Sequence, residues 1–150
     1  MKEIYIEGRC TFGTCDNVFC VILPEKDKCF EFSDRVGIAR EACNLMKKFA
    51  GDMCSLSCDD RGVSATCGDI FIEFNTATSD KPHIFVEKEG IVFALEEVDA
   101  ITVTRDGMVT FRGTLGNIAV DFAGQRVIFF PGQCSSVDCT IKKMISVGEL

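Results

Sequence analysis

The stretch that decides the fold is DAITVTRDGMVTFRGTLGNIAVDFAGQRVIFF, residues 99–130. Short turns divide it into four segments of alternating apolar and polar residues, a pattern typical of antiparallel strands joined as hairpins. A two-residue first loop would mix apolar and polar side chains on each face. A three-residue loop over 105–107, with Gly107 in the left-handed conformation, keeps the apolar side chains together, and a slip of one residue would undo this. The predicted pairs on the buried face are Val103–Val109, Ile101–Phe111, Phe111–Ile118, Val109–Val120, Val120–Val127 and Ile118–Phe129.

The next two turns keep the same face buried. Residues 113–116 fit a four-residue loop, and Ala123-Gly124 closes the last hairpin with Asp121 opposite Arg126. A two-residue type I′ turn requires a positive φ at Ala123, which an alanine disfavours, so a longer loop is the alternative. Because three successive turns agree on one buried face, the sequence predicts a single continuous sheet here.

One helix is predicted, over residues 34–50. Ser33 is its expected N-cap and Gly51 its end, with lysines in the last turn. The helix should cover one side of the sheet with its apolar face. That face comprises Ile38, Ala39, Ala42, Leu45, Met46 and Phe49, and the solvated face comprises Arg40, Asn44, Lys47 and Lys48.

The rest of the chain adds further short strands. A hairpin turns at Gly68-Asp69, in a register that suits a type II′ turn. A second hairpin turns at Glu89-Gly90, and because its strands are apolar on both faces we expect it in the interior of the fold. Residues 137–147 fit both a strand and a helical stripe, and their β-branched residues favour a strand. The other strands are expected at 2–7, 18–23, 28–32, 63–67, 70–74, 83–88 and 91–95.

These elements predict an α+β fold that is mostly antiparallel β. The expected architecture is a curved or barrel-like β-meander of hairpins with one main α-helix (about 34–50) packed against it, in a single domain spanning residues 1–150. With 47% hydrophobic residues the chain is not disordered.

Charge and hydropathy restrict the class of protein. The chain has 23 acidic and 16 basic residues, a net charge of −7, which argues against direct nucleic-acid binding. No uncharged apolar run reaches the length of a signal-peptide core or a membrane span. We therefore expect a soluble, cytoplasmic protein without a membrane partner, whose ten cysteines are mostly reduced.

Cysteine is the unusual component of the composition. Six of the ten fall in loop-like segments as three pairs, and two pairs brought together could hold Zn²⁺ in a tetrahedral thiolate site. The gaps of three or four residues differ from the two-residue gap of common zinc knuckles, so free thiols are favoured over a metal site, and a metal site over functional disulfides. Cys20, Cys43 and Cys67 occupy core positions and are interpreted as packing residues. The metal hypothesis names Cys10, Cys15, Cys134 and Cys139 as ligands, with Cys54 and Cys58 as alternates.

Catalytic patterns are weak. His83 is the single histidine, and its place beside a strand favours an incidental surface residue over half of a Cys–His pair. Glu96, Glu97 and Asp99 cluster at a strand connection and are interpreted as solvated turn residues. Gly113–Gly116 is too short for a phosphate loop and does not precede a helix. The sequence thus predicts no enzyme and no cofactor.

Three functional hypotheses remain. The leading one is a small acidic, non-enzymatic binding protein: a protein–protein interaction module or inhibitor that engages a basic partner, in one version by imitating nucleic-acid charge. The first alternative is a carrier or sensor of a small apolar ligand, held in a barrel cavity lined by some of the 13 phenylalanines. The second is the cysteine-liganded metal protein. Edge strands and apolar residues on both faces near Phe85–Ala94 also allow a homo-oligomer.

Overall fold

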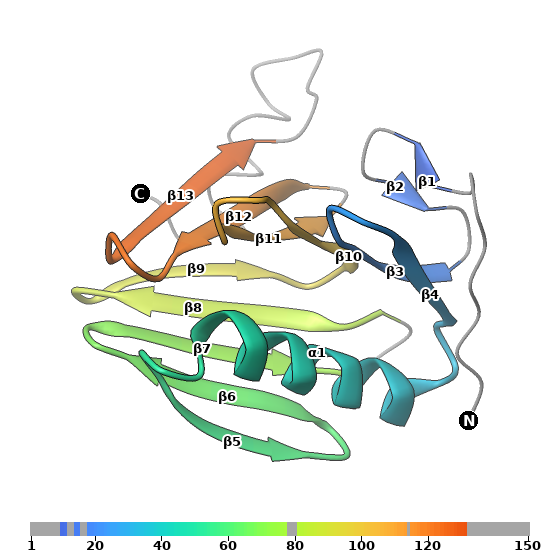
Figure 1. Ribbon diagram of the computed structural model, residues 1–150, viewed down its shortest axis with the longest axis horizontal. Coiled ribbons are helices and arrows are strands. Elements are labelled where there is room, and N and C mark those ends of the chain that lie inside the picture. Colours follow the sequence, from blue (N-terminus) through green and yellow to red (C-terminus); the bar gives the residue numbers. More distant parts are fainter. Residues whose placement is uncertain (1–9, 12–13, 16–17, 78–80, 114, 132–150) are drawn as a thin grey trace.

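The computed structural model describes residues 10–11, 14–15, 18–77, 81–113 and 115–131. Over these residues the chain forms strands in three sheets and one helix (Figure 1). The predicted strands at 2–7 and 137–147 lie outside the described residues. The elements are β1 (Cys10–Thr11), β2 (Thr14–Cys15), β3 (Val18–Ile22), β4 (Asp27–Glu31), α1 (Arg35–Ala50), β5 (Ser55–Asp59), β6 (Gly62–Cys67), β7 (Ile70–Asn75), β8 (His83–Lys88), β9 (Ile91–Leu95), β10 (Val98–Val103), β11 (Val109–Gly113), β12 (Gly116–Asp121) and β13 (Arg126–Pro131).

The predicted meander forms most of a six-stranded sheet with the order β13-β12-β11-β10-β3-β4. Gly107 has a φ of +87°, as the three-residue turn requires. β3 joins the meander in parallel with β10, with Cys20 opposite Ala100. All six predicted pairs are confirmed: Val103–Val109, Ile101–Phe111, Phe111–Ile118, Val109–Val120, Val120–Val127 and Ile118–Phe129.

The last turn of this sheet is the longer alternative. β12 ends at Asp121 and β13 begins at Arg126, so four residues form the loop, and these two ends face one another as predicted. The positive φ falls on Gln125, at +54°, rather than on Ala123.

A five-stranded sheet, ordered β5-β6-β7-β8-β9, contains the other two predicted hairpins. Gly68 has a φ of +63°, and Glu89 and Gly90 have φ values of +53° and +81°, which gives both turns their two-residue form. The expectation that the β8–β9 hairpin is buried on both faces is wrong. Ile84 and Val86 are buried, whereas Phe85 on the opposite face is half-buried, because β8 turns only one face toward the core.

α1 packs against β5, β6 and β7 with its predicted apolar face, and the predicted basic face is exposed. The predicted N-cap is wrong by one residue. Asp34, not Ser33, precedes the helix, and its Oδ1 accepts a hydrogen bond from the Gly37 N–H at 3.1 Å. A carboxylate at this position also complements the positive end of the helix dipole.

The core lies between the two large sheets and α1. The sheets are curved but do not close into a barrel (Figure 1). Phe74 packs against Phe19 and Phe111, with ring centroids 5.9 and 6.0 Å away, and so links the five-stranded sheet to the six-stranded one. No helix among the described residues is long and apolar enough to cross a membrane.

Candidate functional site

A surface pocket lies where the chain passes from one large sheet to the other. It has a volume of about 360 Å³ and is lined by His83, Leu95, Glu96, Glu97 and Leu115. His83 begins β8 and Leu95 ends β9, so neighbouring strand ends form one wall. The two glutamates form the whole link between β9 and β10. The pocket therefore sits on the crossover between the sheets.

Two interactions and one close backbone approach fix this link. The Val98 N–H donates to the Pro82 carbonyl oxygen at 2.9 Å, and the Lys81 ammonium lies 2.7 Å from a carboxylate oxygen of Asp99. Gly113 approaches the Glu97 carbonyl so closely that a Cβ there would overlap the carbonyl oxygen. Because the backbone is held on both sides, the glutamates are presented from a well-defined connection rather than from a long loop.

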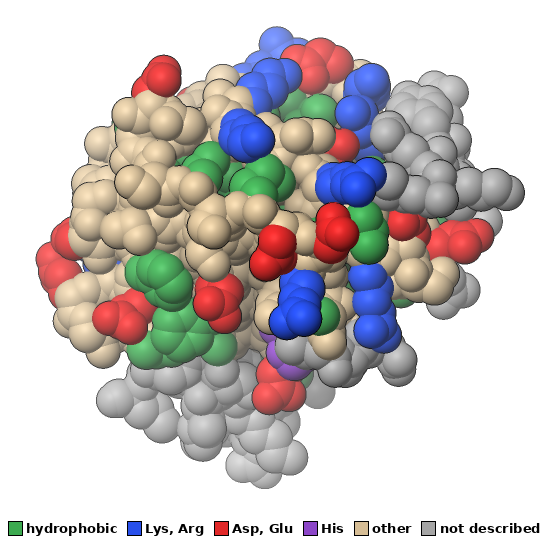
Figure 2. Space-filling view, turned by 90° about the horizontal axis from the view of Figure 1, so that it is seen from below, with side chains coloured by type: hydrophobic (Ala, Val, Ile, Leu, Met, Phe, Trp, Pro, Cys, Tyr) green, Lys and Arg blue, Asp and Glu red, His purple; other side chains and the backbone are tan. Residues whose placement is uncertain are grey.

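The pocket combines acidic and apolar groups. Glu96 and Glu97 are exposed, Leu95 is buried, and Leu115 is 39% exposed. An arginine or lysine side chain has the matching chemistry, since its aliphatic part can cover leucine while its charged end meets carboxylates. Over the face seen from below, acidic and basic side chains are interspersed rather than gathered in a field of one sign (Figure 2). The pair of glutamates, rather than the net charge of the protein, therefore distinguishes this pocket from the rest of the surface.

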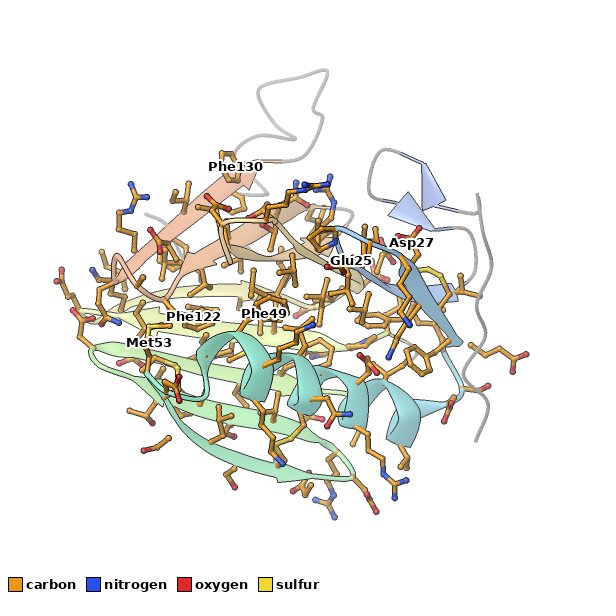
Figure 3. The ribbon with its side chains drawn as sticks, viewed as in Figure 1. Glu25, Asp27, Phe49, Met53, Phe122 and Phe130 are labelled. Atoms are coloured by element: carbon orange, nitrogen blue, oxygen red, sulfur yellow. A yellow bond between two sulfur atoms is a disulfide. The ribbon has the colours of Figure 1, made fainter. Side chains whose placement is uncertain are left out.

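An exposed phenylalanine lies at the same end of the molecule. Gly116 is opposite Pro131, which places Leu115 and Phe130 at one end of the β12–β13 hairpin. Phe130 is 47% exposed and projects away from the rest of its sheet (Figure 3). Exposed aromatic and aliphatic side chains beside charged groups are typical of protein-binding surfaces.

From the sequence, His83 was not connected with the cluster of Glu96, Glu97 and Asp99. Glu96 and Glu97 were expected to be solvated turn residues, and His83 an incidental surface residue. The structure brings all three to one pocket, while Asp99 turns to Lys81 instead. The hairpin register contained a usable signal: it places Ile84 opposite Leu95, so His83 must lie beside the residues that follow Leu95.

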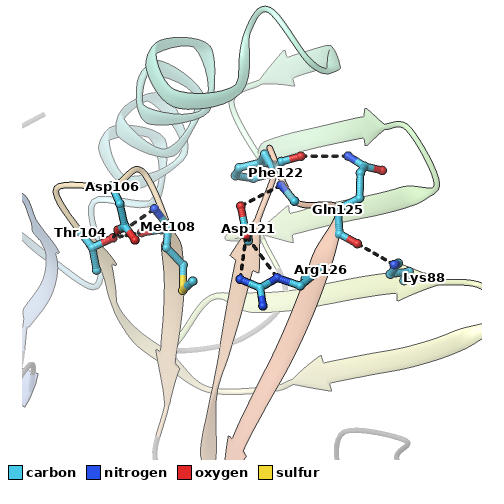
Figure 4. A network of polar contacts seen from close by, with 9 residues as sticks. Lys88, Thr104, Asp106, Met108, Asp121, Phe122, Gln125 and Arg126 are labelled. Atoms are coloured by element: carbon cyan, nitrogen blue, oxygen red, sulfur yellow. Dashed lines mark hydrogen bonds and ion pairs between the residues drawn. The ribbon is translucent and has the colours of Figure 1, made fainter.

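The opposite end of β8 is tied to the other sheet by polar contacts (Figure 4). The Lys88 ammonium donates to the Gln125 carbonyl oxygen at 2.6 Å, and Gln125 Oε1 accepts from the Asp69 N–H at 3.2 Å. In the same loop, the Gly124 N–H and the Arg126 guanidinium hold the pKa of Asp121 below its ordinary value. The Lys88 and Asp69 contacts join the two sheets, and those of Asp121 stabilise the β12–β13 turn.

The expectation of reduced cysteines is wrong for six of them. The structure contains the disulfides Cys20–Cys29, Cys43–Cys58 and Cys54–Cys67. Cys20, Cys43 and Cys67 are buried as predicted, yet each is also cross-linked. The sequence interpretation missed this because the partners come from different elements, and only the fold shows which cysteines meet.

The proposed metal ligands are only partly described. Cys10 and Cys15 are directly opposite across the β1–β2 hairpin, whereas Cys134 and Cys139 lie outside the described residues. The alternates Cys54 and Cys58 are bonded to different cysteines and offer no thiolate to a metal in this state. In the described ranges no three His, Cys, Asp or Glu residues are grouped to hold a metal ion. The zinc site at Cys10, Cys15, Cys134 and Cys139 stays a prediction.

Comparison with known proteins provides no functional assignment. No protein-family model, curated protein or solved structure matches the chain. Function must therefore be argued from the geometry of the described residues.

Proposed function

We propose that this protein is a non-enzymatic protein-binding module, and that the pocket at the β9–β10 link receives an arginine or lysine side chain of its partner. The observation that carries the proposal is the pair Glu96 and Glu97, exposed above Leu95 and beside Leu115 in a pocket of about 360 Å³. The proposal keeps the acidic interaction module expected from the sequence and adds a specific contact surface to it.

The energetics favour an inserted basic side chain over loose charge attraction. Ion pairs between fully exposed groups contribute only about 0–1 kcal/mol. A guanidinium that enters a partly apolar pocket makes charge-assisted hydrogen bonds of about 1.5–3 kcal/mol and adds apolar contact along its stem. Phe130, at the same end of the fold, supplies an aromatic contact for residues that flank the inserted side chain.

The compartment is part of the proposal. Disulfides persist in oxidising surroundings and are rare in the cytosol. Three of them in the described residues support a working place in an oxidising compartment over the cytosol expected from the sequence. The cross-links then stabilise a scaffold on which the pocket is presented.

The apolar-ligand carrier and the version of the leading hypothesis that imitates nucleic-acid charge gain no support from the described residues. The apolar-ligand carrier requires a closed barrel with a cavity lined by phenylalanine, but the sheets are open and Phe74 packs against both Phe19 and Phe111. A protein that imitates nucleic-acid charge requires a continuous acidic surface. On the face shown in Figure 2, basic side chains lie between the acidic ones. We propose neither.

Titration of ¹⁵N-labelled protein with a short arginine-containing peptide, followed by NMR, tests the proposal. The backbone amides of His83, residues 95–97 and Leu115 should shift together, and the apparent affinity should fall with added salt. A peptide with citrulline in place of arginine keeps the stem but lacks the charge, and should bind at least about tenfold more weakly, equivalent to about 1.4 kcal/mol.

The matched protein control separates this site from general acidity. The double variant Glu96→Gln with Glu97→Gln should abolish the shifts, whereas the double variant Glu25→Gln with Glu89→Gln changes the net charge equally at exposed residues outside the pocket and should retain them. Equal loss in both variants, or shifts spread over all acidic regions, would contradict the pocket. Self-association measured by sedimentation in the same samples identifies a second copy of the chain as the occupant.

A further inference from the structure

We infer that the Cys43–Cys58 disulfide is a reversible thiol-modification site, at which a low-molecular-weight thiol forms a mixed disulfide with Cys58 and releases Cys43. The inference is independent of the proposed binding pocket. It rests on the exposure of one cysteine, the burial of the other, and the cationic residues on the helix beside the buried one.

Exposure distinguishes this cross-link from the other two in the described residues. Cys20 and Cys29 are both fully buried, and Cys67 is fully buried in the Cys54–Cys67 bond. Cys58 is instead exposed, on β5 at the edge of the five-stranded sheet. An attacking thiolate must reach a sulfur in line with the disulfide bond, so access decides which bond exchanges first.

The disulfide lies in a surface pocket of about 290 Å³. One wall is the exposed face of α1 and the other is the end of β5 with the turn that follows it. Its volume accommodates a small thiol rather than a folded protein. The lining residues are Arg40, Cys43, Asn44, Lys47, Cys58, Asp59 and Asp60.

The two cysteines have different roles because their surroundings differ. Cys43 is 6% exposed, and Arg40 and Lys47 lie three residues before it and four after it, on the same face of α1. Positive charge in such positions stabilises the thiolate that Cys43 becomes when the bond breaks. Cys43 is thus the better leaving group, while Cys58 is the accessible target.

The acidic residues of the pocket are partly neutralised. The Arg40 guanidinium lies 3.8 Å from an Asp60 carboxylate oxygen, and both side chains are well exposed. Asp59 accepts hydrogen bonds from the backbone N–H groups of Arg61 and Gly62, at 2.8 and 3.2 Å, and is directed to the turn. Among the described residues Lys47 forms no ion pair, so its positive charge is not paired with a carboxylate and can act on Cys43.

The exchange is balanced without a further oxidant. The electron pair of the external thiolate forms a new S–S bond to Cys58 Sγ, the Cys43–Cys58 bond breaks, and its electron pair leaves with Cys43 as a thiolate. The external thiol is oxidised to the mixed disulfide and Cys43 is reduced. The reverse attack by Cys43 restores the original bond and expels the thiol, so the modification is reversible.

Glutathione is the probe for the test. The intact folded protein is incubated with reduced glutathione, quenched at increasing times with acid and N-ethylmaleimide, and mapped by peptide mass spectrometry. At the shortest times we expect glutathione on Cys58 and maleimide on Cys43, with the Cys20–Cys29 and Cys54–Cys67 bonds intact. Glutathione on Cys43, no adduct at all, or simultaneous opening of all three bonds would overturn the inference.

Charge variants test the leaving-group role. Lys47→Gln should slow adduct formation several-fold, because Cys43 is a poorer leaving group without this cation. Lys48→Gln is the matched control, because Lys48 is an exposed lysine of the same helix turn that lies over the Phe49 ring instead, with 5.3 Å from its ammonium to the centroid. Equal rates of adduct formation in the two variants would show that Lys47 does not assist the departure of Cys43.

Discussion

Replacement of Gly113 by alanine tests whether the β9–β10 link is held as rigidly as its contacts indicate. A Cβ at this position would lie 3.4 Å from the Glu97 carbonyl carbon and would overlap the carbonyl oxygen. To bring this Cβ and the Glu97 carbonyl oxygen to ordinary van der Waals contact, one of the two backbone segments must move by roughly 1 Å. The oxygen belongs to backbone that is fixed by the Val98–Pro82 hydrogen bond, so it cannot move as a flexible side chain would.

Overpacking of this kind costs about 1–3 kcal/mol. With an m-value of about 2 kcal/mol/M, a loss of about 2 kcal/mol lowers the urea midpoint by about 1 M, measured by circular dichroism with the disulfides intact. The amide signals of Glu97 and Val98 should shift in the same variant. The arginine-containing peptide should also bind more weakly, because the two carboxylates move with the link.

The control for this variant is Gly107→Ala. Gly107 has a φ of +87° and open space around its Cα, so alanine there meets backbone strain but no neighbouring atom. It lies in the turn at the other end of β10, and its replacement should destabilise the protein without changing peptide binding. If Gly113→Ala unfolds at the wild-type urea concentration, or leaves the signals of Glu97 unmoved, the reasoning about the link is refuted.

Three further predictions concern the scaffold. Asp34→Ala should lower the free energy of unfolding by about 1 kcal/mol in urea denaturation, while Ser33→Ala should have little effect, because Asp34 is the N-cap of α1. The opposite result would show that Ser33 caps the helix, as expected from the sequence. The stability advantage of wild type over Asp121→Asn should be constant near neutral pH and decline as the pH falls through the lowered pKa of Asp121, because a depressed pKa stabilises the fold only while the carboxylate is charged. An advantage that does not change with pH in the acidic range would contradict this. Joint replacement of Cys54 and Cys67 by serine should lower the free energy of unfolding by about 3 kcal/mol, and an unchanged melting temperature in calorimetry would show that the bond does not restrict the unfolded chain.

The sequence was sufficient for the parts of the fold that depend on turn geometry. Turn length and the alternation of apolar and polar residues together determine the strand register. A slip of one residue would move the apolar side chains of a strand to the opposite face of the sheet. This is why Ile101 was correctly placed opposite Phe111 and Val109 opposite Val120. The helix was found from the spacing of its apolar residues, which is local as well. Such information is local, and a single sequence displays it.

What the sequence could not provide depends on non-local contacts. The buried hairpin face was misjudged because Phe85 is apolar yet lies on the half-buried side, against Phe71, whose ring centroid is 6.3 Å away. The pairing of Cys43 with Cys58 requires knowing that α1 lies beside β5. In the candidate site, the predicted hairpin at Glu89-Gly90 already sets His83 beside Glu96. Leu115 lies between β11 and β12, and only the fold brings it to them.

The parallel alignment of β3 with β10 has a consequence for synthesis on the ribosome. The two strands meet through Cys20 and Ala100, which are separated by 100 − 20 = 80 residues. At about 5–20 residues per second, translation needs roughly 4–16 s to deliver the later strand. During that interval the nascent N-terminal hairpin exists without its neighbour, with one hydrogen-bonding edge open. A chaperone that shields open edges should therefore contact the emerging chain before the C-terminal meander appears.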